Sequence, residues 1–150
     1  MQDSIKYILQ ILPQMLEGLK ITIKLFVVTL VLSLPLGLLI SLFKEAVSKR
    51  PTDNFVIRWI VKMPIRFIIN VYLWVFRGTP LLLQLFFFYF GLTYVTLPNG
   101  ESITLSMFTA AVISFVLNYA AYFAEIYRSG IESMPVGQYE AAKVLGYSRV

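Results

Sequence analysis

The sequence predicts an all-α membrane protein in which three helices span the bilayer. Only 14% of the residues are charged and 58% are hydrophobic, whereas soluble domains carry roughly 25% charged residues. About 20 apolar residues cross the hydrocarbon core as a helix, and a lone strand would leave backbone groups unpaired in lipid. Runs without charge cover residues 25–43, 78–100 and 102–124, and the turn formers Pro98, Asn99 and Gly100 predict a turn between the last two spans. We therefore expect spans at about 20–43, 79–95 and 104–128.

Composition also excludes several kinds of chemistry. The chain has no cysteine and no histidine, so disulfides, thiolate nucleophiles, imidazole bases and Cys/His zinc sites are excluded. No glycine-rich phosphate loop is present either. We therefore expect no catalytic residue, metal or cofactor in this chain. The basic residues flank apolar runs instead of forming one stripe, which favours a lipid bilayer over nucleic acid as the partner.

The segment ahead of the first span is amphipathic. Its apolar residues recur at helical spacing, at Ile5, Ile8, Leu9, Leu12 and Leu16. This pattern predicts a short helix over residues 1–18 that lies in the membrane interface and bends at Pro13. The alternative is an extension of the first span. Within that span, one side carries small residues, which indicate close helix packing: Thr22, Thr29, Ser33, Gly37 and Ser41.

Orientation follows from the lysine and arginine residues. Residues 49–54 form a predicted polar turn, and residues 57–76 a mixed helix whose basic face suits the headgroup layer. Between residues 44 and 77 the chain carries Lys44, Lys49, Arg50, Arg58, Lys62, Arg66 and Arg77, whereas residues 92–102 carry none. The positive-inside rule places that basic segment, and everything after Arg128, in the cytoplasm and the N-terminus outside. Lys6, Lys20 and Lys24 count against this orientation, but two loops outweigh them.

The second span begins at a predicted helix start. Pro80 suits a first helical position, and Thr79 precedes it as a cap. Gly78 permits a break from the preceding helix. Free amide groups and the positive end of the helix dipole then lie beside Arg77, an arrangement that can hold a carboxylate. Alternatively, Arg77 anchors the helix in lipid phosphates. Gln84 shares the face of Arg77.

The third span carries a polar stripe on one side, within about 60° of arc at 100° per residue. Its members are Ser114, Asn118, Tyr122 and Glu125. Such a stripe faces a protein interior or a water-filled path. A path is favoured at Asn118, whereas for Glu125 the alternative is that it lies at the interface and pairs with Arg128. Beyond the span, residues 138–145 predict a short cytoplasmic helix that ends at Gly146 in a left-handed cap and docks in a partner's groove.

Three ordered segments carry a resemblance to a known family. They are Arg77-Gly78-Thr79-Pro80-Leu81-Leu82-Leu83-Gln84, Ala121-Tyr122-Phe123-Ala124-Glu125-Ile126-Tyr127-Arg128 and Gly137-Gln138-Tyr139-Glu140-Ala141-Ala142. From about residue 19 to residue 149, the chain resembles bacterial ABC importer permeases of the polar amino-acid (His/Glu/Gln/Arg/opine) family. The resemblance implies a type I ABC importer transmembrane domain in the inner membrane, with a coupling loop at residues 130–150 that carries a coupling helix.

The resemblance also implies partners and site residues. An ATP-binding cassette subunit hydrolyses ATP, a second permease completes the path, and an extracytoplasmic binding protein delivers the amino acid. The substrate-binding candidates are Arg77, Thr79, Gln84, Asn118, Tyr122 and Glu125. The coupling candidates are Gly137, Gln138, Glu140, Ala141, Ala142 and Gly146. In the family two more spans follow the loop, whereas this sequence stops at Val150, so we expect residues 1–150 to be part of a longer permease. The alternative function is a channel-like or structural membrane protein whose polar stripe lines a pore.

The predicted orientation can be tested by labelling, since the sequence has no native cysteine. A cysteine at Asn54 should react with an impermeant reagent only from the cytoplasmic side, and one at Asn99 only from outside. The reverse pattern would contradict the orientation.

Overall fold

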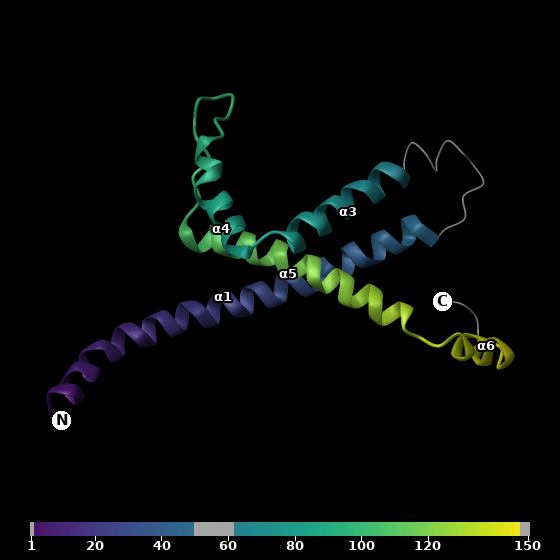
Figure 1. The fold of residues 1–150 in the computed structure, drawn as a ribbon, viewed down its shortest axis with the longest axis horizontal. Helices are drawn as coiled ribbons and strands as arrows, with labels where there is room; N and C mark the ends of the chain where they lie inside the picture. Colours follow the sequence, from purple (N-terminus) through teal and green to yellow (C-terminus); the bar gives the residue numbers. More distant parts are fainter. Residues whose placement is uncertain (1, 50–61, 148–150) are drawn as a thin grey trace.

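The described residues form helices joined by turns and loops, with one isolated bridge between Thr96 and Ser102. The structure is a computed structural model that describes residues 2–49 and 62–147 (Figure 1). Along the chain the elements are α1 (Gln2–Lys49), α3 (Met63–Gly78), α4 (Leu81–Tyr89), the 3₁₀ turn η2 (Gly91–Tyr94), α5 (Met107–Glu132) and α6 (Val136–Val144). The predicted all-α class is confirmed for this part of the chain.

Helices α1 and α5 cross in close contact (Figure 1). At Gly37 an added Cβ would lie 2.7 Å from Cβ of Phe123 and 3.0 Å from the carbonyl oxygen of Ala120. Inside a membrane the hydrophobic effect does not drive helices together. Small residues instead let the helix backbones approach closely, and van der Waals packing then holds the helices together. Most of the predicted small-residue side of the first span is indeed buried: Thr29, Ser33, Gly37 and Ser41. Thr22 is exposed, and its hydroxyl donates to the Gly18 carbonyl oxygen at 2.9 Å.

These two helices run in the same direction. Near one end, the ammonium group of Lys24 lies 5.0 Å from the centre of the Phe108 ring. Toward the other end, the Lys44 ammonium lies 3.6 Å from a carboxylate oxygen of Glu125. Two parallel spans separated by one return crossing are what the predicted orientation requires.

The prediction of a separate interfacial helix over residues 1–18 is wrong. Helix α1 is continuous from Gln2 to Lys49, with Pro13 and Pro35 inside it. A proline removes one backbone hydrogen bond, but neither Pro13 nor the following Gly18 ends the helix. The segment is therefore an extension of the first span, and the stretch suited to crossing a membrane is Gln10–Val47.

The helix predicted over residues 79–95 is present as α4 and η2, but it is one arm of a bent pair and not a span by itself. Helices α3 and α4 meet at a bend of 106°, where Gly78 and Pro80 interrupt the backbone pattern. Helix α4 has only 9 residues, about 14 Å at 1.5 Å per residue, which is too short to cross a bilayer alone. Two helices, Gln10–Val47 and Met107–Glu132, are long and apolar enough to span, and the bent pair makes a third if it counts as one span.

The helix over residues 57–76 was predicted to lie in the headgroup layer, whereas the described helix α3 packs against the other helices. It packs on the helix pair through Leu73, which is buried against Ala121 and Ala124 of α5. The mixed composition reflects one face packed on protein and another face exposed. The predicted turn at 49–54 and the start of that helix fall in residues 50–61, outside the described residues.

The remaining turns match their predictions. Gly100 has φ +84° and donates its backbone N–H to the Leu97 carbonyl at 2.9 Å, which closes the expected turn before α5. Gly146 has φ +77° and ends α6 in a left-handed cap. There its N–H donates to Lys143 at 3.2 Å, and the N–H of Tyr147 donates to Ala142 at 3.0 Å. This pair of bonds is the Schellman motif.

The close crossing predicts opposite effects for two glycine substitutions in α1. Gly37→Ala should lower the free energy of unfolding by about 1–3 kcal/mol, because neighbouring backbone atoms cannot yield to the new methyl group. Gly18→Ala is the control, since nothing lies within 4 Å of its Cβ position and alanine favours a helix. Thermal unfolding of the purified protein in detergent measures both. A melting temperature for Gly37→Ala equal to that of the control would contradict the close crossing.

Candidate functional site

The C-terminal end of α3 is held by donors from outside the helix. The last carbonyl groups of a helix have no partner within it, and water is scarce inside a bilayer. Thr79 donates its N–H and its hydroxyl to the Val75 carbonyl, at 3.0 and 2.8 Å. The next carbonyl, that of Phe76, accepts from Nδ2 of Asn118 at 2.7 Å and from Nε2 of Gln84 at 3.0 Å. Side chains of α4 and α5 thus complete the end of α3.

Two buried amides form the centre of this arrangement. Asn118 is 5% exposed and Gln84 is 7% exposed. Nδ2 of Asn118 also donates to Oε1 of Gln84 at 3.1 Å, which joins α5 to α4. Nε2 of Gln84 reaches the Thr79 hydroxyl oxygen at 2.8 Å. We call Asn118 and Gln84 the amide pair.

The predicted capping role of Thr79 needs correction. The N-cap of α4 is Pro80, and no side chain makes a cap hydrogen bond there. The Thr79 hydroxyl donates back to α3 instead. A threonine N-cap accepts a hydrogen bond from a backbone N–H of its helix, whereas here the Thr79 hydroxyl oxygen accepts from the Gln84 side chain.

The polar stripe of α5 faces this end of α3. Asn118 bonds the Phe76 carbonyl, and one turn later the Tyr122 hydroxyl lies 3.5 Å from the Arg77 carbonyl oxygen. A further turn along, Glu125 approaches the Arg77 guanidinium at 3.7 Å. Ser114, the first member of the stripe, is buried and donates to Ala110 within α5. Three of the four stripe residues therefore contact α3.

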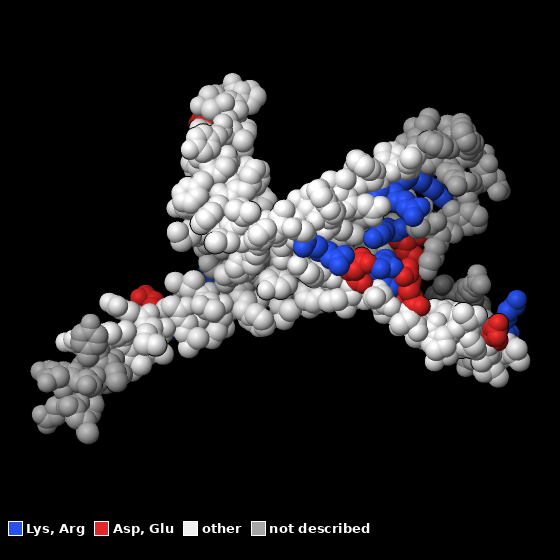
Figure 2. All heavy atoms as spheres, in the orientation of Figure 1, with Lys and Arg blue, Asp and Glu red and all other residues white. Residues whose placement is uncertain are grey.

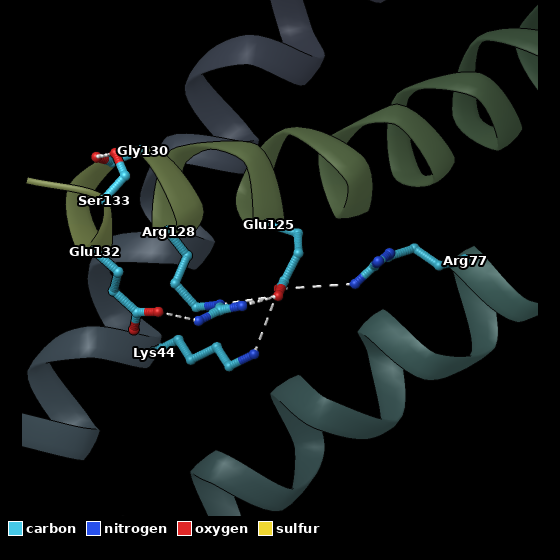
Figure 3. A network of polar contacts seen from close by, with 7 residues as sticks. All are labelled: Lys44, Arg77, Glu125, Arg128, Gly130, Glu132 and Ser133. Atoms are coloured by element: carbon cyan, nitrogen blue, oxygen red, sulfur yellow. Dashed lines mark hydrogen bonds and ion pairs between the residues drawn. The ribbon is translucent and has the colours of Figure 1, made fainter.

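Glu125 lies among three cations from three helices (Figure 3). Its Oε1 accepts from Nε of Arg128 at 2.9 Å, so the predicted pair within α5 is present. Its Oε2 lies 3.6 Å from Lys44 of α1 and 3.7 Å from Arg77 of α3. Arg128 also contacts Glu132. Figure 2 shows charged side chains gathered where α1, α3 and α5 approach one another.

An open cleft of about 470 Å³ lies beside this carboxylate. It lies between α3 on one side and the pair formed by α1 and α5 on the other. The lining residues are Lys44, Asn70, Leu73, Trp74, Arg77, Gly78, Tyr122 and Glu125. The Arg77 guanidinium lies 5.8 Å from the centre of the Tyr122 ring. Cationic groups and aromatic faces in one cleft suit a small ligand that carries both a carboxylate and an ammonium group.

The structure brings the six substrate-binding candidates together, but in two roles. Arg77, Tyr122 and Glu125 line the cleft. The amide pair and Thr79 are engaged with backbone carbonyl groups at the break. Sequence analysis did not assign a substrate role to the other lining residues, which are Lys44, Asn70, Leu73, Trp74 and Gly78. Apart from Gly78 at the predicted helix start, only Lys44 has a sequence feature that could have indicated a role at the site, because it is the first charged residue after the first uncharged run.

The coupling candidates lie on and just beyond α6, which follows the C-terminal end of α5 and stands apart from α3 and α4 (Figure 1). Their side chains are exposed, except for half-buried Ala142. In residues 2–49 and 62–147, no three acidic side chains come together in a way that could hold a metal ion.

Comparison with known proteins identifies the class and then the family. Residues 61–150 match the family described as "Binding-protein-dependent transport system inner membrane component". The chain is 41% identical over 135 residues to the arginine transport system permease protein ArtQ of Bacillus subtilis, covering 90% of this chain and 53% of that protein. It is 38% identical over 144 residues to the putative glutamine transport system permease protein GlnP of Rickettsia typhi, covering 94% of this chain and 57% of that protein.

A solved structure agrees with these relatives. The chain matches the "crystal structure of an amino acid ABC transporter with histidines" with a TM-score of 0.73 and 34% identity, covering 95% of this chain and 57% of that one. The protein is therefore a membrane-embedded helical protein of the ABC permease fold. It belongs to the binding-protein-dependent transport system inner membrane component family. The chain spans a little over half the length of these relatives.

The amide pair predicts coupled effects on stability. Asn118→Ala and Gln84→Ala should each lower the free energy of unfolding by about 1–3 kcal/mol, because each leaves a buried polar partner unsatisfied. The two costs should not add, because the bond between the amides is lost in either single substitution, whereas the Phe76 carbonyl loses both donors only in the double substitution. Chemical unfolding of the four proteins in detergent measures the cycle.

Asn99→Ala is the matched control, because that exposed amide bonds only locally, to Glu101 at 3.0 Å. It should change the unfolding free energy by less than about 0.5 kcal/mol. Strict additivity of the Asn118 and Gln84 substitutions would show that the two amides act separately.

Proposed function

We propose that the chain is a membrane permease subunit of an ATP-driven importer for polar amino acids. The observation that carries this proposal is the match to the family over residues 61–150, which includes both the cleft-lining end of α3 and the exposed helix α6. The named relatives are permease proteins of arginine and glutamine transport systems. The chain supplies part of the translocation path and carries no catalytic residue of its own.

In this proposal the protein crosses the bacterial inner membrane three times with its N-terminus outside. Helices α1 and α5 cross in the same direction, and the bent pair of α3 and α4 makes the return crossing. The gathering of Lys44 and Arg128 around Glu125 supports this orientation, because it puts basic residues of α1 and α5 at the same end of the two spans.

The cleft is the proposed substrate site. Burying an unpaired carboxylate or ammonium group costs several kcal/mol, so an amino acid needs a partner for each. Arg77 offers a guanidinium for the carboxylate. The faces of Trp74 and Tyr122 offer a site for the ammonium group. Glu125 holds Arg77 from the other side, while Thr79, Gln84 and Asn118 fix the backbone that carries it.

Partner subunits supply the remaining functions. Helix α6 docks in a groove of an ATP-binding cassette subunit, where ATP is bound and hydrolysed. A second permease subunit, identical or homologous, completes the path, and an extracytoplasmic binding protein delivers the amino acid. The exposed surface of α6 and its fixed Schellman end support a docking role.

A channel-like protein is the alternative. In a channel the polar stripe of α5 would line the pore and leave its side chains free for water and ions. The hydrogen bonds of Asn118 and the ion pair of Glu125 with α3 favour the importer instead, because they use the stripe for contacts between helices.

Proteoliposomes that contain the assembled transporter test the proposal. We expect uptake of L-glutamine or L-arginine that requires ATP inside. Gly146→Val should reduce amino-acid-stimulated ATP hydrolysis, because a left-handed conformation costs a β-branched residue about 1–2 kcal/mol, a five- to thirtyfold loss of the capped state. Glu140→Lys should reduce it by reversing a charge on α6. Membrane insertion should be unchanged in both.

Gly18→Val serves as the control, because nothing lies within 4 Å of its Cβ position and it belongs to the N-terminal half of α1 and not to α6. Normal stimulated hydrolysis in both α6 variants would reject the coupling role. Amino-acid flux without ATP would favour the channel.

A further inference from the structure

The two oxygens of the Glu125 carboxylate have different partners (Figure 3). Oε1 is held by Arg128 of the same helix, with a hydrogen bond from Nε at 2.9 Å. Oε2 is shared by Lys44 at 3.6 Å and Arg77 at 3.7 Å. Neither distance is that of a charge-assisted hydrogen bond, which runs at about 2.7–2.9 Å. Two cations therefore compete on similar terms for one oxygen.

These two cations belong to different parts of the fold. Lys44 lies on α1, and the close approach at Gly37 fixes α1 against α5, which carries Glu125. Arg77 lies at the end of α3, next to the break, on the opposite wall of the cleft. Its side chain is 41% exposed, against 24% for that of Lys44. Arg77 is thus the cation that a ligand in the cleft reaches more readily.

Because Oε2 has two cationic partners, the Glu125 carboxylate does not depend on Arg77 alone. Removing one partner from a buried ion pair is costly, because it leaves the other charge uncompensated. Here Glu125 would keep Lys44 on Oε2 and Arg128 on Oε1. The carboxylate stays paired without Arg77, so Arg77 is free to pair with another carboxylate.

We propose that Lys44 is a positioning residue for substrate binding: it neutralises Glu125 while Arg77 transfers from Glu125 to the carboxylate of the amino acid in the cleft. This inference rests on the proposed function of the cleft. The exchange moves no proton and breaks no covalent bond. It replaces one ion pair across the cleft, between α3 and α5, by another between α3 and the ligand.

Lys44→Met in the assembled transporter tests the exchange. Without Lys44, Arg77 becomes the main partner of Oε2 and is retained by Glu125. We expect the apparent KM for uptake of L-glutamine or L-arginine, whichever the parent transports, to rise roughly tenfold, as for the loss of one charged contact. The maximal rate should stay within about twofold of the parent. Lys44→Gln should give the same result, and it replaces Lys44→Met if that variant does not assemble.

Two matched variants separate charge from packing. Lys44→Arg keeps the cation and should keep the parental KM. Lys20→Met removes an exposed lysine from the other end of the same helix and should also keep it. A parental KM in Lys44→Met, a change in maximal rate alone, or equal defects in Lys44→Met and Lys44→Arg would each overturn the inference. Absence of amino-acid uptake by the parent would overturn the proposed function instead.

Discussion

A helix that breaks inside a membrane must find hydrogen-bond donors for the carbonyl groups at its end. Lipid offers none, so irregular backbone persists only where protein or a water-filled cavity supplies them. In this protein the bend of 106° between α3 and α4 meets the requirement with side chains. Thr79 serves the Val75 carbonyl, and the amide pair serves that of Phe76. The bend in turn places Arg77 at the cleft, so the candidate site depends on the capped break.

The capped break needs a fixed frame, which the crossing of α1 and α5 provides. Small residues bring the two backbones together at Gly37. Helix α5 then places Asn118 and Glu125 within reach of the Phe76 carbonyl and the Arg77 guanidinium of α3. The pair of α1 and α5 and the attachment of α3 to it are stabilised by different kinds of contact. Close packing joins α1 to α5, whereas polar contacts carry much of the attachment of α3, and polar contacts can exchange partners. This difference allows a ligand in the cleft to compete for the polar contacts of α3 without disturbing the packing of α1 on α5.

The sequence allowed much of this fold to be predicted, because local chemistry determines the elements concerned. Gly100 and Gly146 lie at positive φ, where predicted turns and caps need them. The buried side of the first span followed from its spacing. The continuity of α1 through Pro13 could not be predicted, because a proline weakens a helix without always ending it. The glycine and proline near residue 79 indicated a break, but its angle depends on contacts with α5.

The site was predicted as a set of residues more successfully than as a set of roles. Periodicity shows that Asn118, Tyr122 and Glu125 share a face. It does not show whether that face meets a ligand or the end of another helix, since both demand polar groups inside a membrane. Lys44 was missed because its partner comes from a helix distant in sequence. The structure supplies this information by placing the end of α3 against the stripe.

The most direct test of the capped break is an experimental structure of the assembled transporter with its amino acid bound. We expect Nδ2 of Asn118 and Nε2 of Gln84 to remain within hydrogen-bond distance of the Phe76 carbonyl oxygen, while the amino acid lies in the cleft beside Arg77. A ligand bound directly by the amide pair, with the Phe76 carbonyl released from both side chains, would contradict it.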